Sequence, residues 1–158
     1  MAHATYPPYK QQPVQYITVG YPDTHSKVVG YLLWFFFGLL GGHRFYYGKP
    51  ISGIVWFFTL GLLGIGWIVD AFLIPSMDQD ADQQFHAGST DYNITWALLW
   101  LFGLFGIHRF YQGKIITGVL YALTGGLFTI GFVYDVLTLN EQISESNYRH
   151  QGKMAYVW

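Results

Sequence analysis

The side chains best suited to bind a ligand are four cations that lie in a repeated aromatic motif. Arg44 and Lys49 lie in the motif His-Arg-Phe-Tyr-x-Gly-Lys, which recurs 65 residues later with Arg109 and Lys114. A guanidinium can form two parallel hydrogen bonds with a phosphate or a carboxylate, so these cations predict binding of an anionic lipid headgroup or of a partner's acid. The interpretation that we favour for these positions is anchoring at a membrane surface, where cations and aromatic rings collect.

Two acids lie inside otherwise uncharged segments. Asp70 and Asp135 are the only charged residues within the two longest apolar runs, 51–74 and 115–139. A carboxylate at the centre of a membrane helix costs roughly 2.5–3.5 kcal/mol on insertion scales, and a proton or ion relay is one function that would explain it. A straight helix from the start of the first run to its acid would span nearly the whole hydrocarbon core. We therefore expect Asp70 not to pair with Arg44.

The histidines of the motif, His43 and His108, are expected on the membrane side opposite to the two acids. A neutral imidazole can bind a metal or serve as an axial ligand of haem or a chlorophyll-type pigment. No Cys, Met or carboxylate stands beside either histidine, and the chain has no cysteine at all. We therefore predict neither a metal nor a cofactor. Paired carboxylates, a nucleophile with its base and a phosphate-cradling loop are not evident, so we predict a non-enzymatic protein.

Glycines follow the same repeat. Six of them lie near the ends of the apolar runs and predict close packing of helix backbones, as small residues allow in lipid: Gly38, Gly41, Gly53, Gly103, Gly106 and Gly118. Gly48 and Gly113 fit a positive φ that would reverse the chain within few residues. The histidine and aromatic positions of the loop motif are also identical in its two copies: His43, Phe45, Tyr46, His108, Phe110 and Tyr111. Their rings are expected at the level of the lipid headgroups.

The elements that must position these residues are apolar segments. Of the 158 residues 52% are hydrophobic and 11% are charged, against roughly 25% charged residues in average soluble chains. The apolar runs cover 28–42, 51–74, 94–107 and 115–139. The longer two meet the requirement of about 20 residues for a membrane crossing, and the shorter two would reach across by extending into the aromatic motif. No amphipathic face is present for water to wet, which disfavours a soluble bundle. We predict an all-α integral membrane protein with four transmembrane helices, arranged as two parallel-repeat helical hairpins.

The repeat also sets the predicted domain organisation. The predicted segments are a Pro-, Tyr- and Gln-rich tail at 1–27, a first repeat at 28–76, an acidic linker at 77–92, a second repeat at 93–142 and a polar tail at 143–158. The first tail is expected to be disordered or ordered by a partner. Pro75 is expected to end the helix before the linker. The polar tail is compatible with a few more helical turns along the surface.

A family resemblance follows from these motifs. The pattern Gly-x-x-Gly-x-His-Arg-Phe-Tyr-x-Gly-Lys, followed by a second helix with Ile-Gly and a terminal Asp, resembles the two-transmembrane-helix domain, the TM-2 domain. Two copies cover about 28–76 and 93–142, whereas a single hairpin is more usual in that family. The resemblance implies paired membrane helices joined by a short loop. It implies no activity and no catalytic residue.

The leading functional hypothesis is a scaffold or accessory subunit of a larger membrane assembly. The alternative is a small transporter, channel or proton-coupled protein that uses Asp70 and Asp135. Expected partners are membrane lipids, anionic ones included, and other membrane subunits or further copies of the chain. A net charge of −1 gives no pull toward nucleic acid. The two motif loops hold four of the eight Lys and Arg residues, so we expect them in the cytoplasm of a multi-pass cell-membrane protein with both termini outside.

Overall fold

The computed structural model describes residues 22–155, and their side chains as far as residue 150. Helices are the regular elements of this part, so the expectation of an all-α fold is confirmed. The first repeat contains α1 (Lys27–Phe37), the 3-10 helix η1 (Gly38–Leu40), α2 (Gly42–Tyr46), α3 (Pro50–Leu63) and α4 (Ile65–Gln84). The second contains α5 (Tyr92–Phe102), η2 (Gly103–Phe105), α6 (Ile107–Tyr111), α7 (Ile115–Phe128) and α8 (Ile130–Ala155). The two repeats therefore have the same order of elements.

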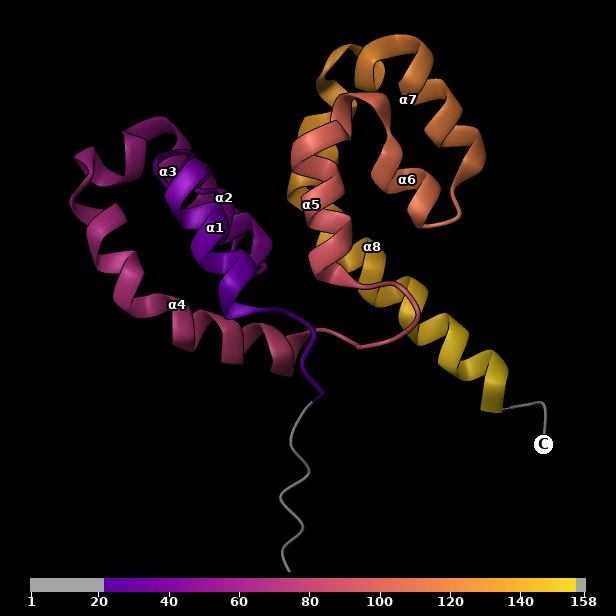
Figure 1. The fold of residues 1–158 in the computed structure, drawn as a ribbon, viewed down its shortest axis with the longest axis horizontal. Helices are drawn as coiled ribbons and strands as arrows, with labels where there is room; N and C mark the ends of the chain where they lie inside the picture. The colour runs from indigo at the N-terminus through magenta and orange to yellow at the C-terminus, as the bar shows by residue number, and fades with distance from the viewer. Residues whose placement is uncertain (1–21, 156–158) are drawn as a thin grey trace, which may run out of the picture.

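Each repeat forms one lobe in which the chain reverses three times. In the second lobe α5 rises, α6 returns, α7 rises again and α8 descends past the other elements, and the first lobe follows the same path (Figure 1). The contacts agree, because α3 packs on η1 and α1 packs on both α2 and α4. One helical hairpin per repeat was expected, and the structure instead has two short hairpins in each.

The long apolar runs are broken, which corrects the expectation of two long straight helices. Residues 60 to 64 have φ between 49° and 83°, so the last residues of α3 and Gly64 form a left-handed turn before α4 begins. The same break separates α7 from α8, which are bent by 115°. By length and apolar character, no described helix could cross a membrane alone, and the bent pair of α7 and α8 is the one combination that could. Four membrane crossings therefore stay a prediction.

The first helices also end earlier than expected. The aromatic motif was expected to prolong the run 28–42, but Gly41 takes a φ of 76° and the chain reverses there. A Cβ on Gly41 would lie 2.7 Å from the carbonyl oxygen of Gly53, so only glycine permits this approach. The motif itself forms the short helices α2 and α6, which fold back against the helices before them. Phe45 and Tyr46 are buried inside the protein.

Pro75 does not end its helix, contrary to expectation. Helix α4 continues through it to Gln84, so most of the predicted acidic linker is helical and only 85–91 connect the repeats. A proline removes the N–H that would bond the carbonyl four residues earlier. Here that carbonyl belongs to Ala71, and it accepts a hydrogen bond from the Tyr31 hydroxyl at 3.1 Å. The contact replaces the missing partner, which explains how the helix tolerates proline.

The core lies where the two repeats meet. Tyr46, Ile74 and Trp96 are fully buried in one cluster that draws on α2, α4, α5 and α8. The end of the predicted first tail joins this core, because the Thr24 hydroxyl and the backbone N–H of His25 both donate to Asp82. The expectation of a disordered or partner-ordered tail is therefore wrong for residues 22–26, and its residues 1–21 lie outside the described part. Helix α8 continues to Ala155, as the polar tail predicted, and residues 156–158 are also outside the described part.

Candidate functional site

A buried cluster of His43, Arg44 and Asp70 is the first candidate site. The Arg44 Nε donates to Asp70 Oδ2 at 2.8 Å, and its Nη2 donates to Oδ1 at 2.5 Å. The Nε2 of His43 lies 2.7 Å from the same Oδ2. His43 and Asp70 have no exposed surface and Arg44 retains 9%. Three donors from one short helix thus converge on one carboxylate of α4.

The second repeat builds the same cluster from His108, Arg109 and Asp135. The Arg109 Nε and Nη2 donate to the two carboxylate oxygens at 2.9 and 2.6 Å, and His108 Nε2 lies 2.8 Å from Oδ2. Two further contacts are added here. Arg109 Nη2 also donates to the Tyr121 hydroxyl at 2.7 Å, and Gln142 Nε2 donates to Asp135 at 3.1 Å.

These clusters overturn two expectations. Asp70 was expected to be too far from Arg44 to pair with it, and the histidines were expected on the membrane side opposite to the acids. Both expectations assumed a straight helix from residue 51 onward. The left-handed break after α3 returns the chain, so α4 brings Asp70 back to the level of α2. The buried carboxylate is compensated by a guanidinium of its own repeat, which lowers the cost of placing it in apolar surroundings.

An aromatic ring completes each cluster. The guanidinium carbon of Arg44 lies 3.5 Å from the centroid of the Trp56 ring, and that of Arg109 lies 4.0 Å from the Tyr121 ring. A cation over a desolvated aromatic face gains about 2 kcal/mol. The arginine is therefore held from two sides, by the acid and by the ring. Because the acid, the ring and the histidine come from α4, α3 and α2, the cluster ties three helices together.

The clusters offer little to a substrate or metal. With Nε2 facing the carboxylate, the buried Nδ1 of His43 and of His108 has no hydrogen-bond partner. Within residues 22–150 no group of three His, Cys, Asp or Glu side chains is arranged to hold a metal ion. The chemistry that this arrangement supports is charge neutralisation and positioning.

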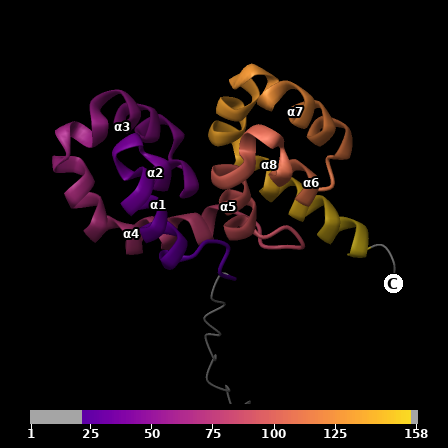
Figure 2. The ribbon, with the colours of Figure 1, turned by 45° about the horizontal axis from the view of Figure 1, so that its top comes forward.

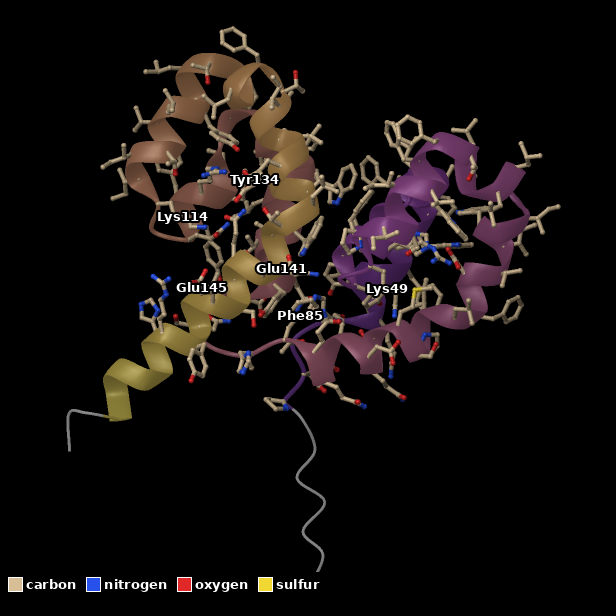
Figure 3. All side chains as sticks on the ribbon, turned by 180° about the vertical axis from the view of Figure 1, so that it is seen from behind. Lys49, Phe85, Lys114, Tyr134, Glu141 and Glu145 are labelled. Carbon is tan, nitrogen blue, oxygen red and sulfur yellow. The ribbon has the colours of Figure 1, made fainter. Side chains whose placement is uncertain are left out.

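The lysines of the motif lie nearer the surface than the arginines. Lys49 Nζ donates to Asp80 at 2.9 Å, and 34% of its side chain is exposed. Lys114 Nζ donates to the side-chain oxygens of Gln112 and Gln142. Figure 3 shows both lysines below the upper ends of the lobes, with Lys114 on the same lobe as Glu145. Since both arginines are engaged by their own acids, the prediction of headgroup binding now concerns the lysines most directly, and it stays a prediction.

The glycines singled out from the sequence lie at close helix contacts. A Cβ on Gly53 would come within 2.6 Å of the Phe45 ring, and one on Gly38 within 2.5 Å of Trp67. The equivalent positions of the second repeat, Gly103, Gly106 and Gly118, meet Phe132, Tyr121 and Phe110 at 2.6 to 2.9 Å. Gly48 and Gly113 have φ of 69° and 74°, as the short chain reversal predicted. The six helix glycines thus let aromatic rings and backbones approach, and Gly48 and Gly113 permit the chain reversal.

Sequence reasoning missed the residues that support the clusters and the breaks. Neither Trp56 nor Tyr121 was expected to lie beside an arginine, although both are aromatic and 65 residues apart. Thr59 and Thr124 were also missed, and each bonds the break that follows it. Both pairs could have been found by following the 65-residue shift beyond the glycines and charges. Gln142 could not, because its counterpart in the first repeat is Met77.

The geometry defines a class of protein before any comparison. Large hydrophobic side chains are exposed on α1, α3, α5, α7 and the first halves of α4 and α8, with Ile51 and Phe72 each 81% exposed, while charge is neutralised inside. A contiguous apolar exterior of this extent is typical of contact with a membrane. Comparison with protein families matches the TM2 domain at residues 23–72 and again at 88–137. The chain belongs to the TM2 domain family of membrane proteins.

Individual relatives support the same assignment. A TM2 domain-containing protein of Dictyostelium discoideum is 50% identical over 60 residues, which is 38% of this chain and 39% of the relative. TM2 domain-containing protein 1 of Homo sapiens is 44% identical over 50 residues, or 32% of this chain and 24% of the relative. The matches thus span about two fifths or less of these relatives. No solved structure matches the chain.

Proposed function

We propose that the protein is a non-enzymatic scaffold or accessory subunit of the cell membrane that holds a partner membrane protein against its apolar surface. The observation that carries the proposal is the closure of both His-Arg-Asp clusters. Each acid is saturated by donors of its own repeat, and each arginine is covered by an aromatic ring. The repeated residues thus serve the fold, which leaves the outer surface for contact with other molecules.

A groove between the two lobes favours one contact surface. This apolar groove has a volume of about 500 Å³. It is lined from the first repeat by Leu40, Phe45, Ile54, Phe57 and Phe58, and from the second by Trp100, Phe132, Val133, Val136 and Leu137. A membrane partner has apolar side chains that would fill such a groove, and packing of this kind drives helix association in lipid. We assign the groove to an apolar helix of the partner.

The clusters argue against the alternative of a proton or ion relay. A relay group must gain and lose a proton, or bind and release an ion, during each cycle. Asp70 would have to give up three donors at distances of 2.5 to 2.8 Å to do so. It would also leave the Arg44 guanidinium buried without its counter-charge, a change that typically costs about 3–5 kcal/mol.

Photo-crosslinking tests the scaffold proposal. A photo-reactive residue is placed at Ile54 or at Val133, one from each side of the groove, and at Leu123 as an exposed control outside it. The proposal expects both groove positions to capture one and the same membrane protein, and Leu123 not to capture it. A bulky Val133→Trp variant should then lower the amount of that partner in its assembly.

A flux measurement separates the two functional classes. Purified protein in sealed vesicles with a pH-sensitive dye inside should pass protons no faster than empty vesicles do. Flux that disappears in Asp70→Asn and Asp135→Asn variants, while both variants remain folded, would establish the transport alternative and remove the scaffold proposal.

A further inference from the structure

The two lobes have uncharged upper ends. We define the apolar ends as the chain reversals at 38–41 and 60–65 in the first lobe and at 103–106 and 125–130 in the second. From residue 28 to 43, 50 to 69, 92 to 108 and 115 to 134 the chain contains no Asp, Glu, Lys or Arg. At the tips, Leu63 is 88% exposed and its counterpart Phe128 is 81% exposed. Each lobe thus presents hydrophobic side chains at its tip.

A threonine hydroxyl at each tip accepts a hydrogen bond from a backbone N–H of the break. A left-handed turn interrupts the ordinary helical hydrogen bonds, and unpaired N–H groups are not tolerated in hydrocarbon. Thr59 solves this by donating to the carbonyl of Val55 at 2.7 Å and accepting from the N–H of Leu62 at 3.1 Å. Thr124 makes the same two bonds, with Leu120 and Leu127, at 2.6 and 3.0 Å. One N–H group of each break therefore keeps a hydrogen-bond partner even where no water is present.

The charged residues lie toward the opposite end of the molecule. Figure 3 shows Lys49, Glu141 and Glu145 well below the upper ends of the lobes. The connection 85–91 and the C-terminal end of α8 also lie on this lower side, away from the tip of the second lobe, in both Figure 1 and Figure 2. The molecule is thus polar at one end and apolar at the two tips of the other.

The helices that lead to the tips are too short to reach through a bilayer. The straight parts of α3 and α7 before their breaks, residues 50–59 and 115–124, have ten residues each, or about 15 Å at 1.5 Å per residue, whereas the hydrocarbon core is about 30 Å thick. Asp70 follows the break by six residues, about 9 Å of helix. The His-Arg-Asp clusters would then lie within the hydrocarbon layer, where only a neutralised pair is tolerated.

We propose that the protein enters the membrane from one side, with the apolar ends of both lobes buried in lipid and the chain returning each time to the side from which it came. The partner surface is the hydrocarbon of a bilayer. Lys49, Lys114, the connection 85–91 and the end of α8 then face the same aqueous side. The inference deepens the proposed function, since it rests on the protein being embedded in a membrane. It replaces the expectation that the motif loops and the termini lie on opposite sides.

Single introduced thiols test this arrangement, because the chain has no cysteine of its own. The polar positions are Lys49→Cys, Ser89→Cys and Lys114→Cys, and the matched tip positions are Leu63→Cys and Phe128→Cys. Each full-length variant is placed in sealed membranes and treated with a membrane-impermeant maleimide from either side. We expect the three polar positions to react from one and the same side, and the two tip positions to react from neither side until detergent is added.

The outcomes are distinct. If Ser89→Cys reacts from the side opposite to Lys49→Cys and Lys114→Cys, the chain crosses the membrane and one-sided entry is overturned, while the scaffold proposal stands. Reaction of a tip thiol from the far side overturns it as well. If the tip thiols react in intact membranes from the same side as all the others, the lobes are not in lipid, and both proposals fall. A fluorophore on Leu63→Cys should in addition be quenched at least twofold more by lipids labelled deep in the acyl chain than by lipids labelled at the headgroup.

Discussion

The two repeats keep the same cluster but differ in several of the residues that support it. His43, Arg44 and Asp70 make the same contacts as their counterparts in the second repeat. The corresponding hydrogen-bond distances to the carboxylate differ by no more than 0.1 Å. The ring beside the arginine is Trp56 in one repeat and Tyr121 in the other, and only the tyrosine adds a hydrogen bond. The ion pair is thus the same in both repeats, whereas the aromatic residue that packs on the arginine differs.

The aromatic motif shows the larger difference. In the first repeat Tyr46 is fully buried, accepts from the N–H of Ser26 at 2.7 Å and donates to Asn93 of the second repeat. Its counterpart Tyr111 is 40% exposed. Helix α2 therefore docks on the second repeat through Tyr46, whereas the ring of Tyr111 on α6 stays partly exposed.

The surface of the second repeat that contacts α2 also differs from the corresponding surface of the first repeat. Asn140 donates to the carbonyls of Phe45 and Tyr46, and the position that corresponds to it in the first repeat is Pro75. Asn93 likewise corresponds to Val28. The first repeat therefore lacks the polar groups that received α2, so the contact between repeats cannot be continued in the same way by another copy. The difference teaches that a cluster inside a repeat and an interface between repeats are separate requirements.

The largest expected effect is loss of the buried acids. Asp70→Asn and Asp135→Asn each leave an arginine without its counter-charge, which should lower the free energy of unfolding by about 3–5 kcal/mol. We expect Asp70→Asn to be the worse, because Arg109 keeps the Tyr121 hydroxyl whereas Arg44 keeps only a ring. Unfolding in mixed micelles, followed by tryptophan fluorescence, measures both, with the exposed acid variant Asp80→Asn as control. A greater loss in Asp135→Asn would contradict this account of the difference.

The next effect concerns acid sensitivity that only the first repeat should have. Burial lowers the pKa of His25 from 6.5 to about 4, and its counterpart is Thr90. Below pH 6.5 the unfolded chain binds a proton that the folded chain refuses, so stability should fall between pH 7 and pH 4.5 by roughly 2–3 kcal/mol.

A His25→Thr variant checks the origin of that loss. The same unfolding measurement at the two pH values should show a much smaller decrease than in the unaltered protein. Burial raises the pKa of Asp78, which acts in the opposite direction and is common to both proteins. An unchanged decrease in the variant would assign the acid sensitivity to another group.

An effect of intermediate size is expected at Tyr46, whose hydroxyl should contribute more to stability than the hydroxyl of Tyr111. Tyr46→Phe removes the acceptor of the Ser26 N–H and the donor to Asn93 inside the core, and should cost about 1–2 kcal/mol. Tyr111→Phe removes one long contact, 3.4 Å from the N–H of Asp91, near the surface, and should cost less than about 0.5 kcal/mol. Equal losses would show that the docking of α2 does not depend on its hydroxyl group.

The smallest effect is expected at the lysines. Lys49 pairs with Asp80, which is 61% exposed, and solvent-screened pairs of this kind contribute about 0.2–1 kcal/mol. Lys49→Gln should therefore change stability little, and the change should vanish in high salt. Lys114→Gln, whose hydrogen-bond partners are neutral amides, should show a weaker salt dependence than Lys49→Gln. A salt-independent loss at Lys49 would point to a packing role of its aliphatic stem.

Some of the fold could be read directly from the residues. The 65-residue shift predicted two equal units, and the positive φ at Gly48 and Gly113 followed from the short reversal. The scarcity of charge predicted a membrane protein, in agreement with the TM2 family. Each of these properties depends on composition or on a few neighbouring residues, so the local sequence is enough to predict it.

Only the tertiary structure decided where the long runs break and which charges meet. A run such as 51–74 is apolar on every face, so its periodicity does not distinguish one straight helix from two short ones that fold back on each other. The choice depends on the left-handed turn that Thr59 supports and on the attraction between Arg44 and Asp70, which are 26 residues apart. Sequence determined the parts and their duplication. Contacts between distant residues determined the pairing, because the energy of a buried charge depends on what lies beside it in space.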